Sequence, residues 1–244
     1  MTTGLILVTG GTGTLGRDLV PLLESRGADV AVLSRHAGNG IRVADLESGV
    51  GLEDALVGVD TVIHLAAGKH QAEEAQNLVT ACESAGIRHL VFISIVGIDL
   101  IPYPYYVAKR AAEEIIEAST VPSTIFRTTQ FHQFVIDVFF APQRRLPVVF
   151  APSLSIQPID TRVVAGVLAD AAFGEPRGRL PDLGGPEVLT GRELATLYAP
   201  GKRVLGFALF GRIWRAFAAG HQLAPTSRAG GRTFADFLAE EPPQ

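Results

Sequence analysis

Short apolar runs alternate with helical patterns along the first 130 residues of this 244-residue chain, and this alternation restricts the possible folds most strongly. The runs expected to form strands are 5–10, 29–35, 41–45, 60–67, 88–94 and 123–129. The patterns expected to form helices between them are 15–27, 51–59, 71–86 and 105–118. Strands that alternate with helices form a parallel sheet with helices on both faces. The sequence therefore predicts an α/β fold with a doubly wound parallel sheet.

The alternation weakens after about residue 130, where we expect a boundary between two parts. Residues 1–130 would form the core of the sheet, and residues 131–244 would complete it and form a small C-terminal substrate-binding part. Within the second part, Thr190 and Glu193 have the spacing of a helix capping box. Several side chains there belong either to an apolar pocket or to a core, namely Phe131, Phe134, Phe139 and Phe140, and His132 is either structural or functional.

The composition excludes several classes of protein. Hydrophobic residues make up 47% and charged residues 19%, which argues against disorder. A formal net charge of -4 provides no positive field for nucleic acid. The lone Cys82 lies in an apolar helical pattern and is expected to be buried and inert, and the scattered histidines predict no metal site.

The apolar stretch 204–220 is interrupted by Arg212 and Arg215 and is too short to span a bilayer. The N-terminus lacks the basic region of a signal peptide. We therefore expect a cytoplasmic protein, monomeric or homodimeric, whose partner is a small-molecule substrate and not a membrane or a nucleic acid.

A glycine-rich turn joins the first predicted strand to the first predicted helix. Gly10, Gly13 and Gly16 are spaced three residues apart in "GGTGTLG". Glycines at this place allow a tight turn and let the backbone approach a pyrophosphate, which would bind at the helix N-terminus. The alternative is an ordinary glycine-rich loop, but the position between a strand and a helix favours dinucleotide binding.

The glycine spacing resembles that of atypical and extended short-chain dehydrogenases/reductases. Other stretches are similar to the NmrA-like branch of that superfamily: "HLAAG" (64–68), "ISIVGID" (93–99), "YYVAK" (105–109), "FRTTQF" (126–131) and "LGGPEVLTGRELA" (183–195). This resemblance implies a Rossmann fold that binds NAD(P), with Ser94 at the active-site serine position. It also implies that three segments contact the cofactor. These are the glycine-rich turn, the loop after the fourth predicted strand and the lysine of the predicted helix 105–118. The residues are Gly10, Thr12, Gly13, Thr14, Leu15 and Gly16 in the turn, Ala66 and Ala67 in the loop, and Lys109.

The end of the second predicted strand bears on the choice of dinucleotide. Proteins that prefer NAD carry an acid there for the ribose 2′-hydroxyl, whereas this chain has Ser34 and Arg35. A guanidinium at this place suits a 2′-phosphate and favours NADP(H) over NAD(H). Alternatively, Arg35 belongs to a solvated turn. The resemblance places Asp45 and Leu46 where family members contact the adenine, although Asp45 is also a good turn residue.

Tyr105 and Lys109 lie four residues apart at the start of a predicted helix, so they share one face. A nearby ammonium lowers the pKa of a phenol and would let Tyr105 donate a proton while Ser94 orients a carbonyl oxygen. The resemblance makes Ser94, Tyr105 and Lys109 the catalytic residues and gives Lys109 a contact with the nicotinamide ribose. Tyr106 follows directly, and a shift of one residue would exchange the two tyrosines.

These features predict an NADP(H)-dependent oxidoreductase that reduces a small, largely apolar carbonyl or quinone-type substrate by hydride transfer. NmrA-like proteins also include non-enzymatic regulators that bind NADP(H) as redox sensors, and this alternative stays open. An epimerase or dehydratase of nucleotide sugars would share the early motifs. The short C-terminal part lacks a polar clamp for a second nucleotide, which argues against that third possibility.

Overall fold

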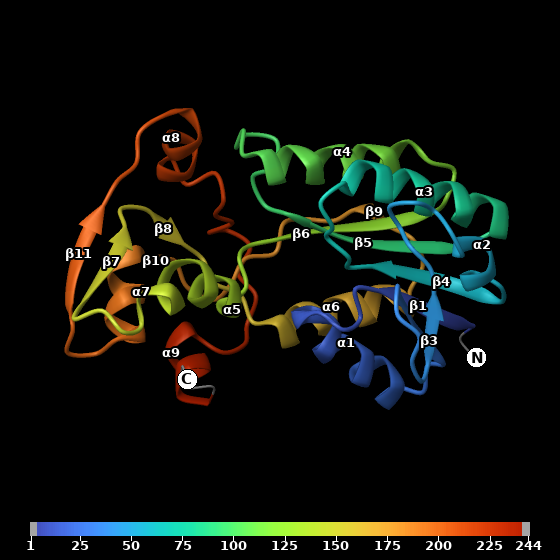
Figure 1. Ribbon diagram of the computed structural model, residues 1–244, viewed down its shortest axis with the longest axis horizontal. Helices are drawn as coiled ribbons and strands as arrows, with labels where there is room; N and C mark the ends of the chain where they lie inside the picture. The colour runs from blue at the N-terminus through green and yellow to red at the C-terminus, as the bar shows by residue number, and fades with distance from the viewer. Residues whose placement is uncertain (1–3, 241–244) are drawn as a thin grey trace. The chain divides into compact units, whose positions relative to one another are not determined.

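The computed structural model describes residues 4–240 and contains a parallel sheet with helices on both faces (Figure 1). Seven strands of the described chain follow the order β3-β2-β1-β4-β5-β6-β9. Their bounds are β1 Leu5–Thr9, β2 Val30–Ser34, β3 Ile41–Val43, β4 Val59–His64, β5 His89–Ile95, β6 Ser123–Thr128 and β9 Gly178–Arg179. The predicted α/β fold with a doubly wound parallel sheet, a Rossmann-like arrangement, is confirmed.

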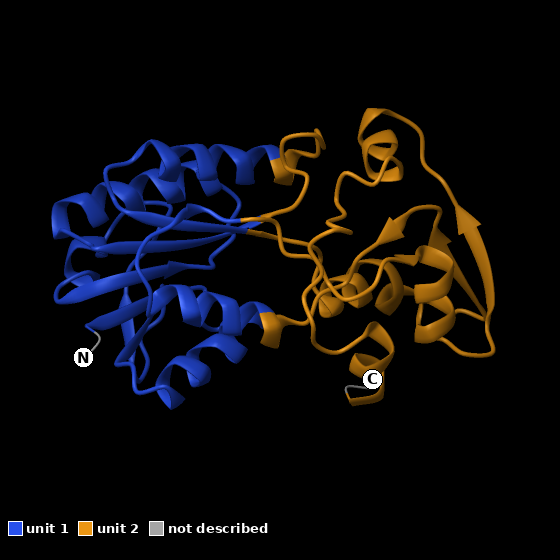
Figure 2. Cartoon of the chain, turned by 180° about the vertical axis from the view of Figure 1, so that it is seen from behind, with its two compact units in different colours: residues 1–94, 107–126, 164–180 blue, residues 95–106, 127–163, 181–244 orange. Residues whose placement is uncertain are grey.

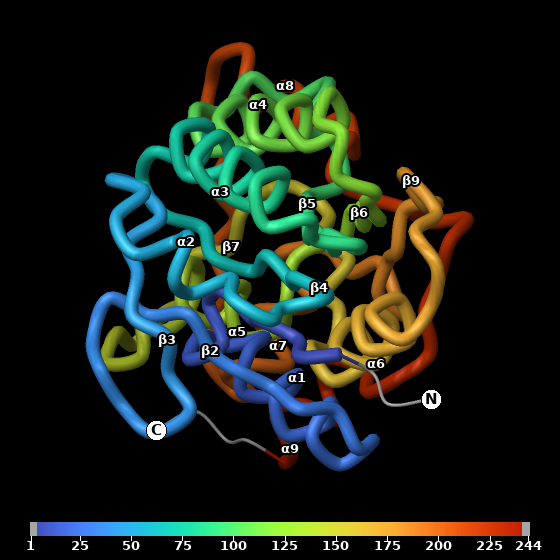
Figure 3. Tube along the Cα trace, turned by 90° about the vertical axis from the view of Figure 1, so that its right-hand side faces the viewer, coloured from blue at the N-terminus to red at the C-terminus, as the bar shows by residue number. Residues whose placement is uncertain are grey.

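Helices cover both faces of this sheet. Helices α3 (Gln71–Ala85) and α4 (Pro104–Ala118) lie on one face, and α1 (Thr14–Ser25) and α6 (Thr161–Ala172) lie on the other (Figures 1 and 3). Helix α2 comprises only Leu52–Ala55 and is much shorter than the predicted segment 51–59. Gly58, which follows it, has a positive φ of 72° that a right-handed helix does not allow. Gly86 closes α3 in the left-handed conformation, as the sequence predicts.

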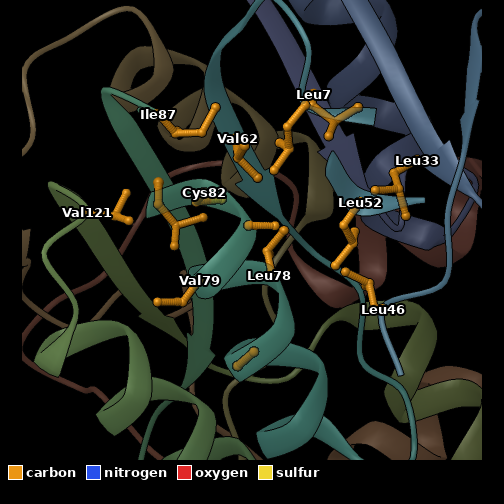
Figure 4. Packing of buried hydrophobic residues seen from close by; sticks show 14 of the residues in the cluster. Leu7, Leu33, Leu46, Leu52, Val62, Leu78, Val79, Cys82, Ile87 and Val121 are labelled. Atoms are coloured by element: carbon orange, nitrogen blue, oxygen red, sulfur yellow. The ribbon is translucent and has the colours of Figure 1, made fainter. Parts of the chain in front are cut away.

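The largest core cluster forms where the strands and helices α2 to α4 meet. Leu7 and Val62 from the strands pack with Leu78 and Cys82 from α3 (Figure 4). Strands such as β5 are buried along nearly their whole length, which explains why their sequences are continuously apolar. Cys82 is fully buried, as expected, and burial raises the pKa of its thiol to about 12.

The chain divides into two compact units that interleave along the sequence (Figure 2). Unit 1 comprises residues 1–94, 107–126 and 164–180, and unit 2 comprises residues 95–106, 127–163 and 181–244. The boundary expected near residue 130, with a substrate-binding part after it, stays a prediction.

Unit 2 contains short elements that the sequence patterns only partly indicate. Its helical elements are α5 His132–Val135, the π-helix Ile136–Phe140, the 3-10 helix Ala141–Gln143, α7 Gly191–Tyr198, α8 Arg212–Ala218 and α9 Phe234–Glu240. Strand β11 (Arg203–Phe207) pairs in parallel with β7 (Val148–Pro152), and β10 (Leu189–Thr190) pairs antiparallel with β8 (Ser155–Ile156). The capping box of Thr190 and Glu193 at the start of α7 is confirmed.

The aromatic side chains of unit 2 divide between core and surface. Phe140 is fully buried, whereas Phe134 is half exposed. His132 is buried: its Nε2 lies 3.1 Å from the Arg232 carbonyl oxygen, and its ring contacts Phe234 and Phe237. These contacts give His132 a structural role in the packing of α9.

Among residues 4–240, no helix combines the length and hydropathy needed to cross a membrane. Within the same described range, no group of three or more histidine, cysteine, aspartate or glutamate side chains could hold a metal ion.

Candidate functional site

The glycine-rich turn between β1 and α1 requires its three glycines for different reasons. Gly10 has a φ of 70°, and a Cβ there would lie 2.8 Å from the Ala66 backbone nitrogen. A Cβ on Gly16 would lie 2.4 Å from the Gly11 carbonyl oxygen, so this glycine lets the helix pack against the turn. A Cβ on Gly13 would approach only the Gly10 carbonyl oxygen, at 3.2 Å. The missing side chain of Gly13 therefore keeps the entrance to α1 open.

The N-terminus of α1 has the properties of an anion-binding site. Gly13 is the N-cap, no side chain caps the helix, and no acidic residue lies in the first turn. The first N–H groups of a helix and its dipole attract a phosphate. Thr12 and Thr14 are exposed beside this end, whereas the Leu15 side chain is buried in the protein. The turn fits a dinucleotide pyrophosphate, and a contact from Leu15 would come from its backbone.

The end of β2 presents a guanidinium and no carboxylate. Arg35 is exposed, and Ser34 Oγ accepts a hydrogen bond from the His36 backbone N–H at 3.2 Å. Asp29 precedes β2 at its opposite end, where its carbonyl oxygen accepts from the Ile6 N–H. The arrangement leaves Arg35 able to meet a 2′-phosphate, and this contact stays a prediction.

The residues expected near the adenine form a turn after β3. Asp45 Oδ1 accepts from the Glu47 N–H at 3.0 Å, which is the turn role that the sequence left open. The Leu46 side chain belongs to the core, and its carbonyl oxygen accepts from Asn77 Nδ2 at 3.0 Å. Any contact of Leu46 with the adenine would therefore involve its backbone, and both adenine contacts stay predictions.

The backbone of the loop that follows β4 is hydrogen-bonded by polar side chains that the sequence patterns do not predict. The Ala66 N–H donates to Thr9 Oγ1 at 3.2 Å, and the same hydroxyl lies 2.7 Å from His64 Nδ1. The Gly68 N–H donates to Glu74 Oε2 at 3.2 Å. The only signal in the sequence is a histidine at the end of an otherwise apolar strand. These bonds position the segment with Ala66 and Ala67, the expected cofactor contacts.

Lys109 is buried and does not point into solvent. Its Nζ lies 4.4 Å from the centroid of the Phe92 ring, a cation–π contact. Burial lowers the pKa of Lys109 to about 8, although the charges of Glu74 and Glu113 act in the opposite direction. The ammonium therefore remains mostly protonated at neutral pH and can donate to hydroxyl oxygens of a bound ligand.

His64 lies beside this lysine and is neutral. Its ring stacks on Phe92 with the centroids 5.4 Å apart. Burial, followed by the charge of Lys109, lowers the pKa of His64 to about 3. The lysine is thus the cation of this cluster, and the histidine is a neutral hydrogen-bonding group.

Ser94 carries a hydroxyl without a partner near the end of β5. The side chain is 1% exposed, and Oγ has no hydrogen-bond partner among the described residues. Because side chains two apart on a strand share a face, Ser94 and Phe92 point to the same side of the sheet. This is the side on which Lys109 lies over Phe92. A buried hydroxyl without a partner fits a group that bonds a ligand.

The two tyrosines at the start of α4 have different environments. Tyr106 is buried with Ile98 and Ile101, and its Oη accepts from Gln130 Nε2 at 3.3 Å. Burial raises the pKa of Tyr106 to about 12. Tyr105 is 39% exposed and is therefore the tyrosine that is open to a ligand.

The expectation that Lys109 lowers the pKa of Tyr105 is wrong for this structure. Burial, with a smaller effect of Tyr103, raises the pKa of Tyr105 instead. Lys109 has its ammonium over the Phe92 ring and is coupled to Glu74 and Glu113. Tyr105 belongs to unit 2 and Lys109 to unit 1, so their joint catalytic role stays a prediction from the motif.

Comparison with known proteins identifies the family. Residues 10–134 match the family described as NAD(P)H-binding, which is just over half of the chain. The chain belongs to this NAD(P)H-binding family. Its cofactor is therefore a nicotinamide dinucleotide, and the open turn at Gly13 suits the pyrophosphate of such a cofactor.

Relatives of known function include reductases. The (4-alkanoyl-5-oxo-2,5-dihydrofuran-3-yl)methyl phosphate reductase of Streptomyces griseus subsp. griseus is 31% identical over 216 residues, which cover 83% of this chain and 74% of that protein. The NAD(P)H azoreductase of Xenophilus azovorans is 29% identical over 209 residues, which cover 78% of this chain and 71% of that protein.

Solved structures share the fold. An NADPH-dependent quinone oxidoreductase from Escherichia coli, complexed with NADPH, superposes with a TM-score of 0.81 at 18% identity. The match covers 96% of this chain and 99% of that chain. At this level of identity the similarity concerns the fold alone.

Proposed function

We propose that this protein is an NADP(H)-dependent oxidoreductase that reduces a small, largely apolar carbonyl or quinone-type substrate by hydride transfer. The buried Ser94 hydroxyl carries the proposal, because it has no partner among the described residues and lies on the same side of the sheet as the buried Lys109. Buried hydroxyl and ammonium groups usually have hydrogen-bond partners, so these two groups suit the binding of a polar ligand. The two reductases among the relatives support the reaction class.

Each proposed residue has one task in this reaction. The turn at Gly13 would hold the pyrophosphate, and Lys109 would donate hydrogen bonds to the ribose hydroxyls. The bound dinucleotide supplies a hydride to the acceptor carbon. Ser94 would donate a hydrogen bond to the acceptor oxygen, and Tyr105 would deliver the proton that completes the alcohol. With its pKa raised, Tyr105 is neutral at pH 7 and holds that proton.

The Tyr105 phenol regains its proton from water, to which it is 39% exposed.

The choice between NADPH and NADH is assigned to Arg35. Replacing Arg35 by Gln removes a charge-assisted hydrogen bond to a 2′-phosphate, worth roughly 1.5–3 kcal/mol or about one to two decades of affinity. Calorimetry should show weaker NADPH binding for Arg35→Gln and nearly unchanged NADH binding. Equal losses for both cofactors would remove Arg35 from this role.

The reaction itself is tested by NADPH consumption. The purified chain would be screened with aldehydes, ketones, quinones and azo compounds, with absorbance at the nicotinamide band as the readout. Turnover with a carbonyl or quinone acceptor, lost in Ser94→Ala at unchanged NADPH affinity, is the expected result. Tight NADPH binding without turnover of any acceptor would contradict the proposal.

A redox-sensing regulator that binds NADP(H) without turnover is the second candidate. One observation favours it: the pKa of Tyr105 is raised, and Lys109 does not assist this phenol. A regulator would bind NADPH and NADP⁺ with different affinities and would keep this difference in Tyr105→Phe. Because the oxidoreductase is also expected to keep its cofactor affinities in Tyr105→Phe, turnover in the NADPH-consumption screen separates the candidates.

A further inference from the structure

A group of apolar side chains is exposed around the short helix α8 in unit 2. Phe210 is 100% exposed, Leu209 is 57% exposed and Ile213 is 38% exposed. They belong to the loop that follows β11 and to the first turn of α8. Helix α8 contains no buried residue. Single exposed apolar residues are common, but three within five positions of the sequence make this segment a candidate interaction surface.

The same segment is nevertheless attached to unit 2. The Phe217 ring contacts those of Tyr103 and Tyr106 at centroid distances of 6.4 and 5.7 Å. The Trp214 ring lies 6.0 Å from that of Phe207 in β11. These contacts hold one side of α8, so the exposed apolar side chains belong to an ordered surface and not to a loose end.

The charged residues closest to these side chains in the sequence are all positive. Arg212 and Arg215 are exposed, and neither has an ion-pair partner in the part of the chain that the structure describes. No aspartate or glutamate lies between Glu193 and Asp236, an interval with six lysines and arginines, although the whole chain has a formal net charge of -4. We name this surface the α8 patch, consisting of Leu209, Phe210, Arg212, Ile213 and Arg215.

We propose that the α8 patch docks on an anionic lipid surface, with Phe210 and its apolar neighbours in the headgroup region and Arg212 and Arg215 on lipid phosphates. A surface-bound segment of this kind combines apolar and aromatic side chains with arginines and does not need the length of a membrane-spanning helix. The proposal departs from the expectation that no membrane is a partner, which rested on the absence of a spanning segment. It is independent of the proposed reaction.

A second copy of the chain fits the α8 patch less well. The common two-fold dimer places a patch against the same patch of its partner. Arg212 and Arg215 would then meet arginines, with no carboxylate between Glu193 and Asp236 to separate them. Lipid phosphates instead complement both arginines.

Trp214 provides a direct readout, because it is the only tryptophan of the chain and lies in α8. The full-length protein would be titrated with vesicles of phosphatidylcholine alone or with about one third phosphatidylglycerol, at low and at physiological salt. We expect a blue shift of the Trp214 emission and co-flotation with the anionic vesicles only, weakened by salt. Absence of binding to anionic vesicles at low salt would overturn the proposal.

Variants separate the two parts of the α8 patch. The double variant Arg212→Gln/Arg215→Gln should bind anionic vesicles roughly tenfold to thirtyfold more weakly, since each basic residue near such a surface contributes about one decade or less. Phe210→Ser should also lose binding, without a change in charge. The matched control is Arg177→Gln/Arg179→Gln, which removes the same charge from exposed positions in unit 1 and should bind normally.

Two further outcomes would count against the proposal. Equal loss in the control pair would show a nonspecific effect of net charge. A Trp214 shift that depends on protein concentration without vesicles, together with a dimer in analytical ultracentrifugation, would assign the α8 patch to a second copy. Unfolding curves and NADPH affinity of each variant verify that the fold is retained.

Discussion

Unit 1 and unit 2 are stabilised by different kinds of buried contact. The core of unit 1 is a continuous apolar cluster in which Leu7, Leu78 and Phe92 are fully buried. In unit 2, a buried ion pair supplements a smaller apolar cluster: Arg232 donates to both carboxylate oxygens of Asp160, at 2.6 and 3.0 Å. The periodicity of apolar residues in the sequence predicts an apolar core of this kind, but it does not predict a buried ion pair between distant residues.

The buried charges of unit 1 have a different setting. Glu74 binds the loop expected to contact the cofactor, and Lys109 lies over Phe92 beside the neutral His64. In unit 2 the pair of Asp160 and Arg232 ties α9 to the start of α6, with Glu240 accepting from Arg232 at 2.8 Å. The buried charges of unit 1 therefore lie near the predicted cofactor contacts, whereas the buried ion pair of unit 2 joins segments that are distant in the sequence.

The largest effect is expected for Tyr105→Phe, which tests the proposed proton donor. Removing one oxygen should lower kcat by about two to four decades, the usual contribution of a positioned general acid. NADPH affinity and unfolding free energy should stay unchanged, because the hydroxyl is not part of a core. Steady-state NADPH oxidation and calorimetry measure both.

Tyr106→Phe is the matched control for Tyr105→Phe. It removes a buried hydroxyl that accepts from Gln130 and should cost stability and little activity. A fully active Tyr105→Phe protein, or a loss of activity confined to Tyr106→Phe, would refute the assignment.

The next largest effect is expected for Arg232→Met, which tests the ion pair between Asp160 and Arg232 within unit 2. It leaves the Asp160 carboxylate buried without its charge partner and should lower the unfolding free energy by about 3–5 kcal/mol. Urea denaturation measures the loss. The double variant Asp160→Asn/Arg232→Met should recover part of it, and an equal loss in both proteins would show that packing, not charge, matters.

The same ion pair has a predictable pH dependence. Burial raises the pKa of Asp160, but the hydrogen bond and charge of Arg232 outweigh it, so the net pKa lies below the ordinary 3.8. Its contribution is therefore complete above pH 3.8 and is lost as the pH falls through the lowered value.

Gly13→Val should abolish most NADPH binding while the fold of unit 1 survives. The side chain would occupy the entrance to α1, where it approaches only the Gly10 carbonyl oxygen. We expect a loss of at least about two decades in affinity, roughly 2.7 kcal/mol or more, by calorimetry. Gly166→Ala is the control, because a Cβ there meets nothing within 4 Å and should leave binding intact. An unchanged NADPH affinity in a folded Gly13→Val protein would refute the pyrophosphate site.

The smallest effect is expected for Glu74→Gln, which tests the buried charges of unit 1. Glu74 raises the pKa of Lys109, so its loss should bring that pKa below about 8. In the variant, Lys109 would lose its proton at a lower pH than in the unchanged protein. Because fewer molecules would then carry the ammonium, NADPH binding should weaken by less than about tenfold at pH 7.5. Affinity measured from pH 6 to 9 gives the shift. The control Glu73→Gln removes the same charge from an exposed neighbouring position. An equal shift in the pH dependence of NADPH affinity for Glu73→Gln would contradict a specific role of Glu74.

Lys109 also affects stability with pH. Its folded pKa of about 8 lies below the ordinary 10.5, so the unfolded chain binds more protons between these values. The contribution of this group to stability is therefore largest above pH 10.5 and is lost as the pH falls through about 8.

The sequence by itself determined the features that depend on neighbouring residues. The alternation of apolar runs and helical patterns predicted the parallel sheet, the spacing of Gly10 to Gly16 predicted the turn at α1, and Gly86 marked the end of α3. Such features follow from backbone geometry and side-chain period within one segment, so they can be predicted without knowledge of the rest of the chain.

Only the tertiary structure decided which charged and polar groups are buried together. Glu74 contacts the loop at Gly68 and affects Lys109, which lies in another helix, and Asp160 pairs with Arg232 across 72 residues of chain. Strand β11 pairs with β7 in the same long-range way. The protonation of a buried group depends on its solvation and on charges brought near by folding, and neither is present in a local sequence pattern.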